Sequence, residues 1–187
     1  MDILAHGLWA GIGVGFASRR WKLSRRTKVL TVAMAVLPDL VQLLPLTLWA
    51  PFAQDGYAVI RAYLRALPSF EPVLPPMVEQ LTHHLHCFMH SAVVAGAVTA
   101  LLWAVLRSFW IPLLGWWSHI AIDVLTHSAD FYPSPVLYPF TQRGLDGLAW
   151  NTPWFLALNY MALTAAAAAL VWSRRLQRGH RAGCASR

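Results

Sequence analysis

Four long apolar runs constrain this chain more than any other feature of its sequence. They cover roughly residues 29–50, 86–106, 109–127 and 153–173, and each is close to the ~20 residues that cross a hydrocarbon core of ~30 Å. A fifth run, 3–18, is shorter and rich in glycine. Backbone polar groups in lipid must be paired within their own segment, so we predict that all five runs are helices.

The overall composition agrees with a membrane protein. Hydrophobic residues make up 57% of the 187 residues and charged residues only 12%, which is about half the charged share of a soluble domain. A chain of this size has too little interior to bury so much apolar surface. The composition therefore argues against a soluble globular domain.

The positions of the basic residues predict the orientation. Six of the 15 Lys and Arg lie in 19–28, one is Arg107 and five follow residue 173, which makes 12, and none of the eight acids lies in these segments. Cytoplasmic loops carry such an excess of Lys and Arg. Five spans, with the N-terminus outside and the C-terminus cytoplasmic, place all three segments inside. The net charge of +7 is thereby explained by membrane topology, and we expect no nucleic-acid partner.

We therefore predict a single all-α membrane domain over residues 1–187, an integral membrane helical bundle. Its five transmembrane helices are expected at 3–18, 29–50, 86–106, 109–127 and 153–173, and its outer loops at 51–85 and 128–152. The first loop contains "GYAVIRAYLRAL", in which apolar residues recur at helical spacing. This pattern predicts an amphipathic helix on the membrane surface, either a connector or a lid over a site.

The stretch "WWSHIAIDVLTHSAD" (116–130) places ionisable side chains in an apolar run. His119, Asp123 and His127 are four residues apart and therefore differ by only ~40° around a helix, and Asp130 joins them if the helix continues that far. An ionisable group in a membrane helix costs a few kcal/mol on insertion scales. Such groups therefore face the protein interior and usually mark function.

Other runs supply matching groups at a similar depth. His6 lies in the first run, Asp39 follows Pro38, and His86 and His90 are four residues apart. With a rise of ~1.5 Å per residue, His6, Asp39, His90, His119 and Asp123 all fall in the outer half of the bilayer. Imidazoles and carboxylates on facing helices predict a divalent-metal site, with zinc as the default and manganese or iron as alternatives. The candidate metal ligands are His6, Asp39, His86, His90, His119, Asp123 and His127.

Two carboxylates are candidate catalytic bases. Asp39 or Asp130 can orient a water molecule for attack on a substrate. Because His127 and Asp130 lie at the predicted outer end of their helix, either can instead support a ligand without touching the metal.

Four short motifs occur in order along nearly the whole chain: His6-Gly7, Pro38-Asp39, His90-Ser91, and Ser118-His119 continuing to Asp123 and followed by a Pro-rich loop. Together they resemble a family of bacterial inner-membrane proteins described as membrane-bound metal-dependent hydrolases, which is distantly similar to the zinc phospholipase C and nuclease group. The chain departs from the family pattern at Val41, where many members have a second acid. It also lacks the arginine that many members carry before the His-Ser pair.

The resemblance implies a multi-pass protein of the bacterial cytoplasmic membrane that hydrolyses a lipid or lipid-linked phosphoester, by analogy with that group. Membrane lipids and a lipid-like substrate would be its partners. Two other classes fit the residues: a transport or binding protein for metal ions or protons, and a haem protein with two axial histidines.

Overall fold

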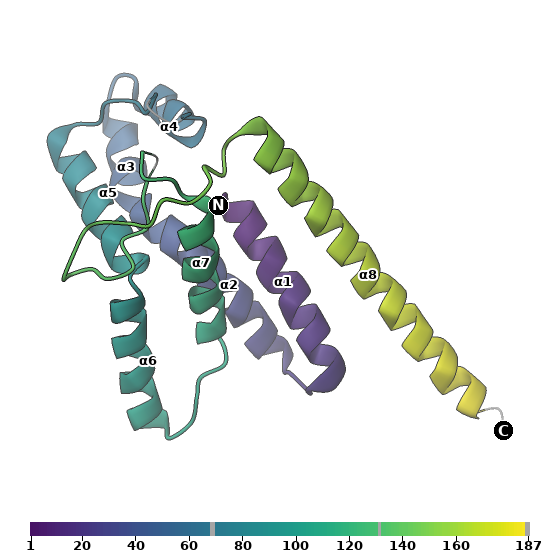
Figure 1. Cartoon of the computed structure of the whole chain (residues 1–187). Helices are drawn as coiled ribbons and strands as arrows, with labels where there is room; N and C mark the ends of the chain where they lie inside the picture. Colours follow the sequence, from purple (N-terminus) through teal and green to yellow (C-terminus); the bar gives the residue numbers. More distant parts are fainter. Residues whose placement is uncertain (68–69, 131, 186–187) are drawn as a thin grey trace.

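The computed structural model describes residues 1–67, 70–130 and 132–185, and Figure 1 shows the course of the chain. The regular structure of these residues is entirely helical, which confirms the all-α prediction. In chain order it comprises α1 (Ile3–Arg20), α2 (Arg25–Gln42), α3 (Leu44–Trp49), a short 3-10 helix (Ala50–Phe52), α4 (Gly56–Leu64), α5 (Pro76–Met89), α6 (Ala92–Leu106), α7 (Leu113–Thr126) and α8 (Pro153–Ala185).

Polar capping residues set where key helices begin. The Asp2 side chain accepts a hydrogen bond from the backbone N–H of Ala5 at 2.9 Å, and Ser91 accepts one from Val94 at 3.2 Å. Each cap pairs a donor that the first turn of a helix leaves free. The first cap fixes the start of α1 and with it the position of His6.

Two of the predicted spans are bent pairs of helices. The run predicted at 29–50 is α2 followed by α3, and the run predicted at 86–106 is the end of α5 followed by α6. Each pair is bent by 57°.

The second bend lies at His90 and Ser91. Backbone groups that the break leaves without helical partners are hydrogen-bonded elsewhere. Ser91 caps α6 from within the break. The backbone N–H of Ala92 donates to the carbonyl oxygen of Val136 at 2.9 Å, so the loop after α7 closes over the break. Because these groups are paired, the bend is compatible with a buried position.

By length and composition, one described helix can cross a membrane as a single segment, namely α8 over Pro153–Gln177. The count rises to three if each bent pair is one span. With 14 residues, α7 is about 21 Å long at ~1.5 Å per residue, which is shorter than a hydrocarbon core.

The centre of the bundle is α2, which packs against α7, α1 and α5. At Gly115 of α7, an added Cβ would overlap the backbone of α2 at Thr31 and Ala35. The absence of a side chain at Gly115 therefore lets the two helices approach closely. This contact brings His119, one turn later, against the backbone of α2.

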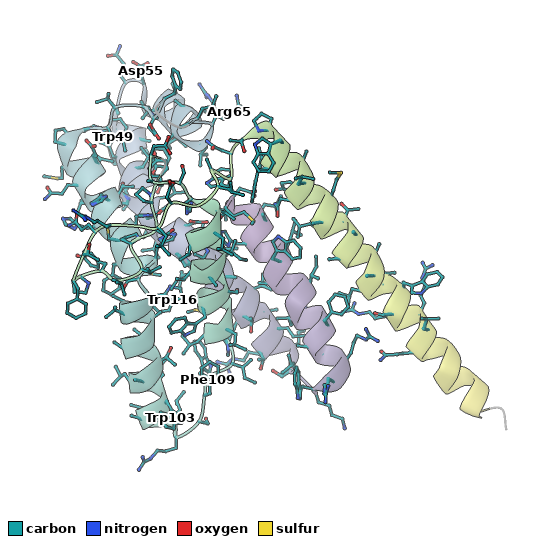
Figure 2. All side chains as sticks on the ribbon, in the orientation of Figure 1. Trp49, Asp55, Arg65, Trp103, Phe109 and Trp116 are labelled. Atoms are coloured by element: carbon teal, nitrogen blue, oxygen red, sulfur yellow. The ribbon has the colours of Figure 1, made fainter. Side chains whose placement is uncertain are left out.

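The two ends of the bundle are formed by different segments and differ in their basic residues (Figure 1). The α1–α2 turn, the α6–α7 turn and the C-terminal end of α8 lie at one end, and α3, α4 and the loop after α7 lie at the other (Figure 1). Trp103 and Phe109 lie toward the first end and Trp49 at the second (Figure 2). The first end carries the basic segment 19–28 and Arg107.

Candidate metal centre

Four side chains from α2, α7 and the end of α5 meet inside the bundle. They are Asp39, His90, His119 and Asp123, and one ligand atom of each lies within 4.8 Å of all the others. His90, His119 and Asp123 are 0% exposed and Asp39 is 5% exposed. The structure thus brings together four of the seven predicted ligands in a group that can hold a metal ion.

These atoms are spaced like ligands of one small cation. His90 Nε2 and His119 Nε2 are 3.0 Å apart. Each lies 3.1 Å from Asp123 Oδ2 and 3.6 Å from Asp39 Oδ1. Tetrahedral zinc with bonds of ~2.0–2.2 Å separates its ligands by about 3.4 Å. Two imidazole nitrogens and two carboxylate oxygens suit zinc, manganese or iron.

Backbone carbonyls fix how the two histidine rings are protonated. His119 Nδ1 lies 2.7 Å from the carbonyl oxygen of Ala35, and His90 Nδ1 lies 2.9 Å from that of His86. A carbonyl oxygen only accepts, so Nδ1 carries the hydrogen in both rings and Nε2 of the neutral ring offers a lone pair. The two lone pairs then face each other.

A proton cannot satisfy this arrangement fully. One added proton on His90 or His119 would satisfy one of the three short contacts among the two Nε2 atoms and Asp123 Oδ2, and the others would still join two acceptors. A divalent cation between the atoms satisfies all of them at once, because every ligand lone pair can point at it.

Three buried atoms at the centre have no hydrogen-bond partner among the described residues. They are Asp39 Oδ2, Asp123 Oδ2 and His6 Nδ1. A buried polar atom without a partner costs of the order of 1–3 kcal/mol, and a charged one costs more. A cation at the centre offsets that cost for the two carboxylates.

The side chain of His6 links α1 to α7. Its Nε2 lies 2.9 Å from Asp123 Oδ1, and its ring stacks on His119 with centroids 3.8 Å apart. The amino group of Met1 is 2.5 Å from the same oxygen. These contacts engage Oδ1 and leave Oδ2 turned toward the two histidines. His6, predicted as a ligand, therefore lies beside the group of four and orients Asp123.

His86 also lies outside the group of four. Its Nδ1 is 2.6 Å from Gln42 Oε1, and its Nε2 is 3.3 Å from the carbonyl oxygen of Pro133. Sequence reasoning missed Gln42. It is a polar residue within an apolar run, one turn after Asp39, and that spacing was the available signal.

α7 ends at Thr126, before both His127 and Asp130, so these two side chains lie in different surroundings. His127 Nδ1 lies 3.1 Å from Ser134 Oγ and 3.7 Å from Asp123 Oδ2, at the margin of the centre. Asp130 is exposed and accepts a hydrogen bond from Ser128 at 2.6 Å. The helix does not continue to Asp130, so this side chain does not join the predicted stripe.

Three of the four candidate ligands lie at the carboxyl ends of helices. Asp39 is in the last turn of α2, His90 follows α5 directly, and Asp123 is in the last turn of α7. The carboxyl end of a helix carries a partial negative charge, which favours a nearby cation.

Two cavities lie at this end of the bundle. One cavity of about 270 Å³, called the inner cavity, includes Asp39 and His127 in its lining. A second cavity of about 570 Å³, called the outer cavity, adjoins it and includes neither residue. Tyr63, His86 and Tyr132 line both.

Sequence reasoning missed the two tyrosines as site residues. Tyr63 lies in α4, inside the predicted amphipathic helix, and its ring centroid is 5.5 Å from that of Tyr132. Burial raises the pKa of both phenols, so both stay neutral near pH 7. The lid interpretation of that segment was the only signal for Tyr63.

Comparisons of the chain with protein-family models, with curated proteins and with solved structures found no match. The function must therefore be inferred from the site itself.

Proposed function

We propose that this protein is a membrane-bound, metal-dependent hydrolase of a lipid or lipid-linked phosphoester. The observation that supports the metal is the pair of buried Nε2 atoms of His90 and His119, 3.0 Å apart and close to two carboxylates. The ordered motifs that resemble a family of membrane-bound metal-dependent hydrolases support the reaction class, by analogy.

We infer a multi-pass protein of the bacterial cytoplasmic membrane, with five crossings and the N-terminus outside. The basic turns and the basic end of α8 lie together at one end of the bundle, as that orientation requires (Figure 1). Large apolar side chains are exposed along the helices, among them Leu101, Leu125 and Trp172 at 64–68%. Lipid contact accounts for exposure on this scale.

The chemistry follows from which side chain faces the cavity. Asp39 is the member of the group of four that lines the inner cavity, and its Oδ2 has no hydrogen-bond partner among the described residues. A divalent cation held by the group supplies polarisation of a phosphoryl oxygen and activation of water. Asp39 then accepts a water proton as the water oxygen bonds to phosphorus, and it passes this proton to the leaving alcohol oxygen as the P–O bond to that oxygen breaks.

The outer position of the centre fits a lipid substrate. Ile3, Leu4, Leu43 and Leu64 also line the inner cavity, and Leu4 and Leu64 are more than half exposed. An apolar wall that reaches the surface lets an acyl chain remain in the bilayer while the ester lies near Asp39.

Elemental analysis of detergent-purified protein tests the metal. We expect stoichiometric metal in the wild type and its loss in His119→Ala and Asp123→Ala, since each variant removes a ligand. His84→Ala and Asp55→Ala change exposed residues of the same types and should keep the metal. Wild-type protein that retains no metal would remove the basis of the proposal.

Hydrolysis is tested separately with phospholipid vesicles and analysis of the released products. Asp39→Asn should lower turnover by about 10²–10⁴-fold if it acts as the base, whereas Asp55→Asn should not. A Soret band in the purified protein would instead favour the haem protein. Metal uptake into sealed vesicles without product release would favour the transporter.

A further inference from the structure

The end of the bundle that carries the basic turns has a cavity that the proposed function does not use. The cavity measures about 470 Å³ and lies between the start of α2 and the turn that joins α6 to α7. Arg26 and Thr27 of α2 line it, together with Ser108 and Trp110 of the turn. We call it the Arg26 cavity. The other residues of its lining are apolar, so it presents one charged group in a largely apolar wall.

No carboxylate balances the positive charge of Arg26. The sequence has no Asp or Glu in residues 3–38, 80–122 or 147–187, which supply every segment at this end. Within the described part of the chain, the Arg26 side chain forms no ion pair and no hydrogen bond. Membrane orientation accounts for basic residues near this end, but it does not require one in a cavity wall. The uncompensated charge attracts an anion.

A second arginine lies next to the lining of this cavity. Arg107 stands between Leu106 and Ser108, two residues of the lining. Its φ is 55°, in the left-handed region where the chain leaves α6. Glycine is favoured at such a position, because it has no Cβ that clashes with the backbone. The chain thus has a positive charge beside the Arg26 cavity where the backbone alone favours another residue.

A second cavity lies along α6, on the side of α7. It measures about 310 Å³, and we call it the Gly96 cavity. Its lining consists of Gly96, Thr99, Ala100, Trp103, Phe109 and Trp117. The hydroxyl of Thr99 is engaged within the protein, since it accepts a hydrogen bond from Trp117 Nε1 at 3.0 Å and donates one to the carbonyl oxygen of Ala95 at 2.6 Å. The cavity therefore offers a ligand mainly apolar surface.

The two cavities are reached from the same side of the molecule. Phe109 lines both and is 44% exposed, and Trp103 beside it is 62% exposed. Both residues lie toward the end that carries the basic turns (Figure 2). A ligand that lies over the exposed Phe109 ring reaches both cavities without passing through the protein. From the end of the bundle along α6, the surface presents positive charge first and apolar side chains next, which is the order of groups in an anionic phospholipid.

We propose that the Arg26 and Gly96 cavities together bind one anionic phospholipid of the cytoplasmic leaflet. The Arg26 guanidinium pairs with the lipid phosphate, Arg107 adds positive charge beside the headgroup, and an acyl chain lies in the Gly96 cavity. Basic pockets between helices on the cytoplasmic side bind such headgroups. A free phosphate would leave the apolar part of the site unused.

This inference goes beyond the proposed function. The two cavities share no lining residue with the inner and outer cavities and contain no member of the group of four. The lipid is therefore a bound partner of the protein and not its substrate. The inference uses the proposed membrane location, but it requires neither the metal nor hydrolysis.

The test is native mass spectrometry of detergent-purified protein with dioleoyl phosphatidylglycerol and with dioleoyl phosphatidylcholine. The two lipids share their acyl chains and phosphate, and only the first has a net negative charge. The mass of each complex identifies the intact lipid, so hydrolysis would be recognised. We expect the wild type to bind the anionic lipid about 20-fold more tightly, since each of two arginines contributes about fivefold.

Charge variants locate the headgroup. Arg26→Gln should reduce the preference about fivefold, and Arg26→Gln/Arg107→Gly should bring the two affinities to within about twofold of each other. Arg107→Gly should not lower the Tm in lipid-free detergent, because glycine adopts the left-handed conformation readily. The matched control is Arg20→Gln, which removes an exposed arginine at the same end that lines neither cavity and should keep the full preference.

A separate variant locates the acyl chain. At Gly96 an added Cβ meets no described atom within 4 Å, so Gly96→Leu extends into open space in the cavity. It should weaken both lipids by at least about threefold, because acyl contacts are lost, and leave the ratio of their affinities unchanged. The metal content should stay at the wild-type value in all these variants, since none of them changes the group of four.

Each outcome decides the matter. Equal affinity of the wild type for the two lipids, or an undiminished preference in the double variant, overturns the inference. An equal loss of preference in Arg20→Gln shows a diffuse charge effect and overturns the site. Inorganic phosphate that displaces the lipid at equal concentration, or unchanged binding of both lipids by Gly96→Leu, overturns the assignment of a phospholipid to the two cavities.

Discussion

The helices α7 and α8 both come from apolar runs, yet they differ in nearly every structural respect. Half of the 14 residues of α7 are buried, including His119 and Asp123, and it packs closely on α2. In contrast, only 17% of the most apolar 18-residue stretch of α8 is buried, and this helix packs against α1. Figure 1 shows α8 leaning away from the rest. One apolar run thus forms a helix that carries candidate metal ligands and, we infer, another forms a lipid-facing helix.

The largest expected effect comes from removing the metal, which should affect α7 more than α8. A cation whose free concentration is a thousand times its Kd stabilises the folded state by about 4 kcal/mol. Chelation should therefore lower the Tm of the wild type strongly. It should also speed amide hydrogen exchange in residues 113–126 more than in 153–177, because α7 carries two of the four candidate ligands and α8 carries none. Equal changes in both helices would contradict the contrast.

The second expected effect concerns close helix packing. Gly115→Ala adds a methyl group against the backbone of α2 and should cost about 1–3 kcal/mol. It should also reduce metal retention, because His119 is one turn away. The matched variant is Gly96→Ala in α6, where an added Cβ meets no described atom within 4 Å. Helix propensity alone should then stabilise the protein by up to about 1 kcal/mol. Thermal unfolding and elemental analysis measure both.

A smaller effect is expected where α8 touches α1. Trp9 Nε1 donates to Asn159 Oδ1 at 2.9 Å. Asn159→Ala should lower the free energy of unfolding by about 1 kcal/mol because the indole N–H loses its acceptor. The metal content should stay unchanged. A variant that lost metal would show that α8 supports the centre, which the contrast denies.

The smallest effect is expected on the outer face of α8. Leu158 is 54% exposed, and Leu158→Ala should change the free energy of unfolding by less than about 0.5 kcal/mol. Denaturation in detergent measures it. A cost of several kcal/mol would mean that this face packs against another protein surface.

The sequence was sufficient to include the four members of the group among seven candidate ligands, because ionisable residues in apolar runs have few acceptable positions. Spacing and depth selected Asp39, His90, His119 and Asp123, but they selected His6 as well and did not separate it from the group. The helical fold class follows from the same constraint, since lipid leaves the backbone few alternatives.

Other features depend on contacts between distant segments and could not be predicted. The end of α7 at Thr126 is accompanied by backbone hydrogen bonds from Gly147, Leu148 and Trp150 to residues 125–127. No local pattern before Asp130 signals this pairing. The supporting place of His6 likewise depends on Asp123, which lies 117 residues away. The second bend was missed although it lies at two polar residues, His90 and Ser91, because the sequence alone supports their interpretation as a site motif within a single span.

The hydrogen bond from His119 to the carbonyl of Ala35 makes the tilt between two helices part of the geometry of the candidate metal centre. Asp39 belongs to the same helix as that carbonyl, and Asp123 to the same helix as His119. Any change in how these helices lean on each other must stretch or compress the polyhedron of ligand atoms. Helix tilt responds to bilayer thickness, so we expect lipids of different chain length to retune metal affinity without altering a single side chain.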